Sequence, residues 1–299
     1  MKILVTGAGG FIGSRVAAGL DASGHDVTSH VRSRDGNLNP GDVTGDFQVV
    51  VNAAGRLGGA NVDYDEMYNA NAVLPSMLAD LCASRGIHLV HMSTPGVTGL
   101  VARADENMEY DPWGDYERTK AEGERAVAEH PGLAGGGATI LRPDFVYGPG
   151  DLHKLPLFRR AFSGIFPLVG RNGGVIRPTY VDDVCSAVKE SLPGGILNGG
   201  LYNVGGPETV TVRELVTAAA GTVNRKVLPV PFPGWFFALF LHLGPLCPRA
   251  LSESRLKLLG NDHYVSIEKA RNAGFEPRWS IRNGLKETVA WYMEKGLLR

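Results

Sequence analysis

Short apolar runs alternate with amphipathic stretches along the first half of the chain. The runs "KILVTG", "HDVTSHV", "FQVVVNAAG", "IHLVHMS" and "GATILRPDFVYG" are rich in β-branched and aliphatic residues, which is typical of buried strands. Helical spacing of apolar positions follows the first run in "SRVAAGLDASG" and recurs near residues 65–84 and 113–129. Strands that alternate with helices predict an α/β fold, a Rossmann-type doubly wound parallel sheet.

The pattern changes twice. Between Arg34 and Phe47 there is only a short Gly/Pro/Asn-rich stretch, so we expect one crossover helix to be reduced or missing. After Tyr147 the chain becomes irregular, while "RPTYVDDVCSAVKESL" and "GLYNVGG" predict returns to the sheet region. We expect an NAD(P)-binding Rossmann domain over residues 1–147, with returning segments near 176–205, and a smaller interleaved C-terminal substrate domain over 148–175 and 206–299.

Composition narrows the class of protein. The 299 residues are 43% hydrophobic, enough to fill a globular core. Thirty basic residues balance 31 acidic ones for a net charge of -1, and no basic run is present, which argues against nucleic acid as a partner. Cys82, Cys185 and Cys247 lie far apart in apolar stretches and are expected to be reduced thiols. Because "MKILVTG" leads directly into a strand, we expect a cytoplasmic protein.

One segment, "PFPGWFFALFLHLGPLCP" at 231–248, is unusually apolar. Its uninterrupted apolar run, from Trp235 to Leu241, is much shorter than the roughly 20 residues that a transmembrane helix needs. We expect a buried or lid-forming helix here, and a monotopic membrane contact is the alternative.

The first turn predicts a dinucleotide site. "GAGGFIG" places Gly7, Gly10 and Gly13 directly after a strand and at the start of a helix. Glycines at this spacing allow a tight turn, close approach of the backbone to a pyrophosphate, and close packing of the helix on the strand. A structural turn is the alternative interpretation.

The end of the second strand indicates which dinucleotide binds. NAD enzymes normally offer a carboxylate there to the adenosine ribose, whereas Val31 stands at about that position here. Arg32 and Arg34 follow and could pair with a 2'-phosphate. NADP(H) is therefore the favoured cofactor and NAD(H) the alternative, with both arginines then solvated charges.

A tyrosine and a lysine lie one helical turn apart in "DYERTK". Tyr116 could move a proton on a substrate oxygen, and the charge of Lys120 on the same helix face could stabilise its phenolate. Ser93 and Thr94 end the strand "IHLVHMST" at the edge where open α/β sheets bind ligands, so one hydroxyl could hold that oxygen. Chance alone can also produce such a pair.

In their order along nearly the whole chain, "TGAGGFIG", "VVNAAG", "YNANAV", "VHMSTPGVTG", "YERTK", "LRPDFVYGPGD", "TYVDDV", "YNVGGPETVTVREL" and "GFEPRWSIRNGLKETVAWY" resemble the extended short-chain dehydrogenase/reductase superfamily. This superfamily includes the NAD-dependent epimerases and dehydratases and the 3β-hydroxysteroid dehydrogenases. The resemblance implies that Tyr116 is the general acid/base, Lys120 its partner and Thr94 the catalytic hydroxyl, with Ser93 as a possible substitute. Asp42 resembles the adenine contact, Asn71 a structural polar residue near the site, and Pro143 and Val146 the segment beside the nicotinamide. The full cofactor-binding set expected is Gly7, Gly10, Phe11, Ile12, Gly13, Arg32, Arg34, Asp42, Val43, Ala53, Ala54, Gly55, Asn71, Tyr116, Lys120, Pro143 and Val146.

Departures from the family pattern bear on the reaction. The 4,6-dehydratases carry an Asp-Glu pair after the catalytic threonine, but Pro95 and Gly96 follow Thr94 and neither transfers a proton. Sugar-nucleotide enzymes usually place an arginine where the simplest register puts Ile176, although Arg171 and Arg177 could still converge on phosphate. "RPTYVDDV" and the apolar 231–248 segment resemble the hydroxysteroid dehydrogenase branch.

These observations predict an NAD(P)-dependent oxidoreductase that transfers hydride between the cofactor and a secondary alcohol or ketone. A sugar-nucleotide epimerase with tightly bound NAD is one alternative, and a non-catalytic dinucleotide-sensing protein is another of a different class. The expected partner is a small molecule, either an apolar alcohol or ketone or a nucleotide sugar. The resemblance alone implies a homodimer. No metal site is expected, since His88 and His91 should face opposite sides of their strand.

Overall fold

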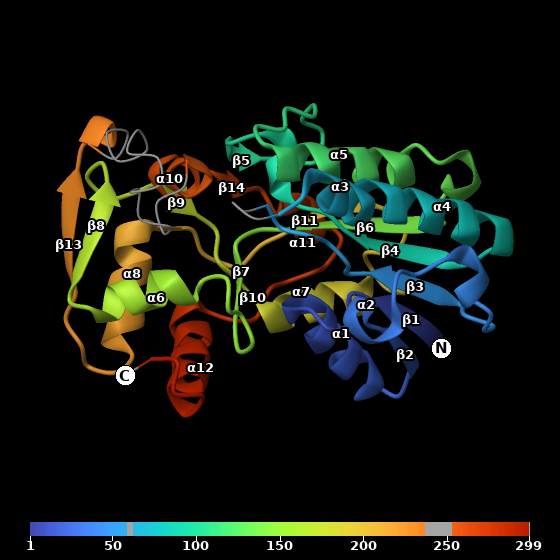
Figure 1. The fold of residues 1–299 in the computed structure, drawn as a ribbon, viewed down its shortest axis with the longest axis horizontal. Helices are drawn as coiled ribbons and strands as arrows, with labels where there is room; N and C mark the ends of the chain where they lie inside the picture. Colours follow the sequence, from blue (N-terminus) through green and yellow to red (C-terminus); the bar gives the residue numbers. More distant parts are fainter. Residues whose placement is uncertain (59–61, 237–252, 299) are drawn as a thin grey trace.

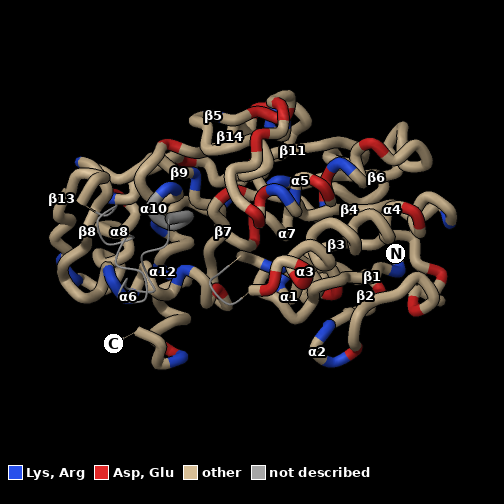
Figure 2. The backbone as a smooth tube through the Cα atoms, turned by 45° about the horizontal axis from the view of Figure 1, so that its top comes forward, with Lys and Arg blue, Asp and Glu red and all other residues tan. Residues whose placement is uncertain are grey.

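The computed structural model describes residues 1–58, 62–236 and 253–298. Figure 1 shows two parts side by side, a sheet with helices above and below it, and a smaller part that holds α6, α8, α10 and α12. Lys and Arg are interspersed with Asp and Glu over both parts (Figure 2).

The larger part is built on a six-stranded parallel sheet in the order β11-β6-β4-β3-β1-β2. This order confirms the predicted Rossmann-type sheet. Its strands are β1 (Lys2–Thr6), β2 (Asp26–His30), β3 (Val49–Asn52), β4 (His88–Met92), β6 (Ala138–Pro143) and β11 (Leu201–Val204).

Both faces of the sheet are covered because its strands are apolar on both sides. Ile3 and Val5 of β1 belong to one core cluster, whereas Leu4 between them belongs to another. The first cluster includes residues of α1 and α7 and the second includes residues of α4, and these helices lie on opposite sides of the sheet (Figure 1). The helices of this part, with two short 3-10 turns, are α1 (Phe11–Asp21), α2 (Arg32–Asp35), η1 (Pro40–Asp42), α3 (Tyr64–Tyr68), α4 (Leu74–Arg85), η3 (Pro95–Thr98), α5 (Asp115–Ala128) and α7 (Val181–Glu190).

The crossover after β2 is reduced, as predicted. It contains only the four-residue α2 and the three-residue η1 before β3 begins. Leu38 and Phe47 from this segment pack against the core beneath α4, so a few apolar contacts take the place of a helix.

The smaller part combines helices with two-stranded sheets. β10 (Thr179–Tyr180) pairs with β7 (Val146–Tyr147) and not with the large sheet. α7 begins immediately afterwards and packs against the large sheet, and β11 joins that sheet beside β6, so both segments return to the sheet region as expected. η4 (Pro131–Leu133) belongs to the larger part, where Leu133 packs in the core with α4. The remaining elements of the chain are β5 (Ala102–Ala104), α6 (Leu155–Phe162), β8 (Ile165–Val169), β9 (Val175–Ile176), β12 (Val210–Thr211), α8 (Val212–Gly221), β13 (Leu228–Phe232), α10 (Glu253–Gly260), β14 (Tyr264–Val265), α11 (Glu268–Asn272) and α12 (Ile281–Glu294).

Two expectations concern residues that are only partly described. The apolar 231–248 helix and Cys247 fall mainly on residues outside the described ranges. Within those ranges, no helix combines the length and apolar character needed to cross a bilayer. Cys82 and Cys185 are buried free thiols.

The predicted helix at 65–84 contains a π-helical turn, η2 (Asn69–Val73), between α3 and α4. α5 packs directly on this turn, because an added Cβ at Gly123 would lie 2.0 Å from the carbonyl oxygen of Asn71. Turns of this kind often occur at functional sites. The absence of a side chain at Gly123 therefore sets how deeply α5 lies against the rest of the fold.

We predict that Gly123→Ala lowers the free energy of unfolding by about 2 to 3 kcal/mol, since α5 must move away from the backbone at Asn71. Gly221→Ala is the matched control, because it lies in a helix with no neighbouring atom within 4 Å of an added Cβ. The control should be neutral or stabilise by up to about 1 kcal/mol. Urea unfolding of both variants measures this, and equal stabilities would contradict the packing argument.

Candidate active site

The phosphate loop lies between β1 and α1. Gly7 has a left-handed backbone (φ 69°), and an added Cβ there would lie 2.5 Å from the amide nitrogen of Ala54. The amide of Gly10 donates to the carbonyl of Gly7 at 2.9 Å, and a Cβ on Gly13 would meet that same carbonyl oxygen at 2.2 Å. A side chain at any of these three positions would therefore crowd the neighbouring backbone. Phe11 and Ile12 begin α1 and pack partly against the core.

The segment that follows β3 crosses this loop and is fixed by Asn71. Asn71 is fully buried, accepts from the amide of Arg56 at 2.8 Å and donates to the Arg56 carbonyl at 2.9 Å. Its amide also donates to the hydroxyl of Thr119 on α5 at 3.0 Å. Ala53, Ala54 and Gly55 are thereby held between the phosphate loop and the π-helical turn. The side chain of Asn71 therefore positions the backbone at Arg56.

The two arginines after β2 are in different states. The guanidinium of Arg34 pairs with Asp35 at 2.7 Å and donates to the Ser29 carbonyl at 2.8 Å. Hydrogen bonds from Arg34 and from the Val31 amide lower the pKa of Asp35 to about 2. Arg32 is exposed and pairs with no side chain in the part of the chain that the structure describes. Of these two arginines, only Arg32 therefore has a guanidinium without a side-chain partner among the described residues.

Asp42 and Val43 lie in the short crossover. One carboxylate oxygen of Asp42 accepts from the backbone and side-chain nitrogens of Asn39, at 2.8 and 3.1 Å, which closes η1. Val43 is buried against the core beneath α4, and its carbonyl accepts from Arg85. Both residues therefore have structural contacts in addition to the expected place near the adenine.

The tyrosine, lysine and threonine meet at the carboxyl end of β4. Lys120 is only 3% exposed, and its ammonium donates to the carbonyl of Met92, the last residue of β4, at 2.5 Å. The hydroxyl of Thr94, two residues farther on, hydrogen-bonds Tyr116, which is half-buried. Ser93 between them is buried, and its hydroxyl has no hydrogen-bond partner among the described residues. Hydroxyls, phenol and ammonium are thus gathered at one point.

Burial is the largest cause of the pKa shifts of Lys120 and Tyr116. It lowers the pKa of Lys120 to about 8, against the opposing charge of Glu124. Burial also raises the pKa of Tyr116, the charge of the adjacent Glu117 raises it further, and the hydrogen bond from Thr94 opposes both. At neutral pH the phenol therefore keeps its proton and the amine is mostly charged.

The segment after β6 reaches the phosphate loop from the other side. Pro143 ends β6 and Val146 begins β7, and between them Phe145 has a positive φ of 35°, a strained backbone for a bulky residue. An added Cβ at Gly150 would lie 3.4 Å from the ring of Phe11. The loop after β7 and the start of α1 are therefore in contact.

Residues 3–205 match the model of the NAD dependent epimerase/dehydratase family. The chain belongs to this family. It is 31% identical over 97% of its length to 2-alkyl-3-oxoalkanoate reductase of Stenotrophomonas maltophilia, with 99% of that protein covered. It is 26% identical over 98% of its length to 3 beta-hydroxysteroid dehydrogenase/Delta 5-->4-isomerase of Mycobacterium tuberculosis, with 90% covered. Among solved structures, MoeE5 in complex with UDP-glucuronic acid and NAD superposes with a TM-score of 0.77 at 22% identity, covering 99% of this chain and 100% of the other.

The relatives of the chain are named as reductases, dehydrogenases and, as for UDP-glucose 4-epimerase of Mycolicibacterium smegmatis, epimerases, so the chain is an enzyme of the extended short-chain dehydrogenase type. The resemblance inferred from the sequence motifs is confirmed at this level. The structural neighbours were solved in complex with NAD. Because they are less than 25% identical to this chain, they show a shared fold and no more.

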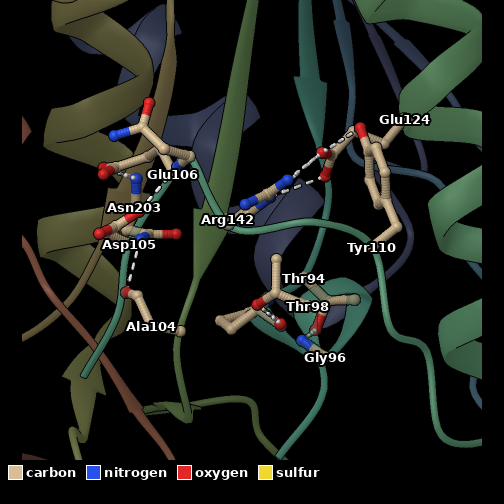
Figure 3. Close-up of polar contacts among 12 residues, drawn as sticks. Thr94, Gly96, Thr98, Ala104, Asp105, Glu106, Tyr110, Glu124, Arg142 and Asn203 are labelled. Carbon is tan, nitrogen blue, oxygen red and sulfur yellow. Dashed lines mark hydrogen bonds and ion pairs between the residues drawn. The ribbon is translucent and has the colours of Figure 1, made fainter. Parts of the chain in front are cut away.

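Sequence reasoning missed several buried polar contacts of this family member. Thr6 donates to Asn52 at 2.7 Å, and the amide of Asn52 contacts a ring nitrogen of His91 at 3.1 Å, which links the ends of three neighbouring strands. Asn203 of β11 donates to the carbonyl of Ala104 at 3.1 Å, which ties the β5 loop to the sheet (Figure 3). Strand-end polar residues in "LVT" and "VVN" were the available signal.

The histidines of β4 do not form a metal site together. His88 contacts Thr139 of β6 at 3.2 Å, whereas His91 contacts β3. Within the described ranges, no group of three or more His, Cys, Asp or Glu side chains could hold an ion.

Proposed function

We propose that this enzyme reduces an apolar ketone to a secondary alcohol, with NADP(H) as the exchangeable cofactor. The observation that carries the proposal is the meeting of Thr94, Tyr116 and Lys120 at the carboxyl end of β4, beside a glycine loop suited to a pyrophosphate. Ligands bind at this edge in open α/β sheets.

The residues present fit a dinucleotide. Gly10 occupies the N-cap of α1 without a side chain, and the first turn of α1 contains no acidic residue. A pyrophosphate could therefore approach the helix N-terminus closely and meet no like charge. A nicotinamide bound alongside would supply the hydride.

The proton chemistry depends on the phenol of Tyr116. An unperturbed phenol has a pKa of about 10 and is protonated at neutral pH, which is the state needed to give a proton to a ketone oxygen, and the surroundings of Tyr116 raise its pKa further. The Lys120 ammonium stabilises the phenolate left behind, and the Thr94 hydroxyl orients the ketone oxygen. The arrangement thus favours reduction at neutral pH.

Two observations support an apolar ketone over a nucleotide sugar. The reductase relative is named for 2-alkyl-3-oxoalkanoates and is covered almost completely. Arg177, a candidate for binding a diphosphate, donates instead to the carbonyls of Val265 at 2.9 Å and Gly206 at 2.8 Å. The Nε and Nη1 atoms of Arg177 are therefore already hydrogen-bonded to backbone carbonyls. The fold likeness to MoeE5 with UDP-glucuronic acid and NAD keeps sugar-nucleotide epimerisation with tightly bound NAD as the second candidate.

We propose that residues 148–175 and 206–299 form the substrate-binding domain, and substrate should slow hydrogen exchange in these segments. The protein is cytoplasmic, which cell fractionation tests.

We predict that Arg32→Ala weakens NADPH binding by about tenfold or more and leaves NADH binding nearly unchanged, because the free guanidinium would pair with the 2'-phosphate. Arg34→Ala is the matched control, since Arg34 is already paired with Asp35 and should contribute less. Fluorescence titration with both nucleotides measures the two affinities. An unchanged NADPH preference in Arg32→Ala would sink the assignment.

The proposed homodimer forms through the α4 and α5 faces. A shallow depression there is lined by Val73, Met77, Leu81 and Glu122, and Val73 is 46% exposed. We predict twice the chain mass in sedimentation equilibrium and dissociation in Val73→Lys. A wild-type protein that sediments as a monomer refutes this arrangement.

We predict that the wild-type enzyme oxidises one NADPH per ketone reduced when tested with 2-alkyl-3-oxoalkanoates and other apolar ketones. Tyr116→Phe should lower kcat by roughly 10² to 10⁴-fold with NADPH affinity retained, since only the proton donor is lost. The wild-type rate should fall as pH rises through about 8, where Lys120 loses its charge. Conversion of a UDP-sugar with no net NADPH consumption would instead favour the epimerase.

A further inference from the structure

A buried ion pair joins α5 to the central sheet directly beneath the candidate active site. Arg142 of β6 and Glu124 of α5 are 2% and 0% exposed. The Arg142 guanidinium donates to both carboxylate oxygens of Glu124, at 3.1 and 3.0 Å from Nε and 2.5 Å from Nη2. The hydroxyl of Tyr110, from the loop before α5, donates to the same carboxylate at 2.9 Å (Figure 3).

Such a pair is a costly way to attach a helix to a strand. Removing two charges from water offsets much of their attraction, and apolar residues of similar volume often hold elements together as well or better. The Nη1 of Arg142 is also buried without a hydrogen-bond partner among the described residues, which adds to the cost. Attachment alone therefore does not account for these charges.

The helix places the pair next to Lys120. Tyr116, Lys120 and Glu124 are spaced by four residues and share one face of α5. The groups that bear on Lys120 are Tyr116 and Glu124 on this helix, His91 on β4 and, through Glu124, Arg142 on β6. Burial keeps the pKa of His91 well below its ordinary value, so the imidazole is neutral. Glu124 is thus the carboxylate whose charge opposes the loss of the Lys120 proton.

The contacts of Glu124 also determine where Lys120 points. Both carboxylate oxygens are occupied by Arg142, and one also by Tyr110. The Lys120 ammonium donates instead to the Met92 carbonyl, at the end of β4 next to Ser93 and Thr94. Glu124 can therefore act on Lys120 through its charge without drawing the ammonium away from the site.

We propose that Glu124 and Arg142 form a positioning pair that keeps Lys120 charged and directed at the end of β4, with Arg142 holding Glu124 off Lys120. The inference rests on the function proposed for Tyr116 and Lys120. Neither Glu124 nor Arg142 is among the residues proposed to touch substrate or cofactor, so both are positioning residues.

The test measures the titration of Lys120 directly. Protein labelled with ¹³C at the lysine ε-carbon is titrated by NMR, and Lys120→Met assigns the Lys120 signal. In Glu124→Gln, which keeps the shape and leaves the Arg142 cation, the midpoint should fall by about one pH unit from about 8. In the double variant Glu124→Gln/Arg142→Met, it should lie between the single variant and wild type. Tyr110→Phe, the matched control that changes no charge, should leave it nearly unchanged.

A wild-type midpoint in folded Glu124→Gln would overturn the proposal, as would a double variant that titrates at or above wild type. The double variant removes both members of the ion pair and so leaves neither Glu124 nor Arg142 buried without its partner; it still decides the matter if Glu124→Gln does not fold. Where turnover is measurable, the alkaline limb of kcat should move with the NMR midpoint. Because the NMR titration needs no turnover, inactivity of the wild type with every ketone would refute the proposed function and not this inference.

Discussion

The contact between α5 and the π-helical turn at Asn71 is the constraint on which the candidate site depends. Gly123 lets the two backbones approach so closely that no side chain could lie between them. At this depth Lys120 reaches the carbonyl of Met92 and Glu124 reaches Arg142. A larger residue at this contact would lift the helix, and both the lysine and the ion pair would lose their partners on the sheet.

The parallel sheet brings the other segments of the candidate site together. All six strands run in one direction, so the glycine turn after β1, the segment after β3 and the hydroxyls after β4 meet at one edge. Cores on both faces bury α5 and the strand ends, and this burial lowers the pKa of Lys120 and raises that of Tyr116. The packing thus sets the pKa values of Tyr116 and Lys120.

The sequence predicted the fold and the composition of the candidate site because both depend on local patterns. Apolar runs and glycine spacing indicated the strands and the phosphate loop, and helical spacing placed Tyr116 and Lys120 on one face. The close packing of α5 on the π-helical turn was not predictable, since Gly123 and Asn71 lie 52 positions apart along the printed chain. The pairings of Arg34 with Asp35 and of Arg177 with backbone carbonyls were also missed, because side-chain partners follow from tertiary structure and not from residue type.

The central claim is that the enzyme reduces a ketone with NADPH. Following the transferred hydride tests this claim most directly. NADPH carrying deuterium at the transferred position of the nicotinamide is mixed with a 2-alkyl-3-oxoalkanoate in a single turnover, and the product is analysed by mass spectrometry. The account predicts one deuterium on the new carbinol carbon and one equivalent of oxidised cofactor. A sugar-nucleotide substrate that changes configuration while the cofactor keeps its deuterium and its reduced state would contradict it.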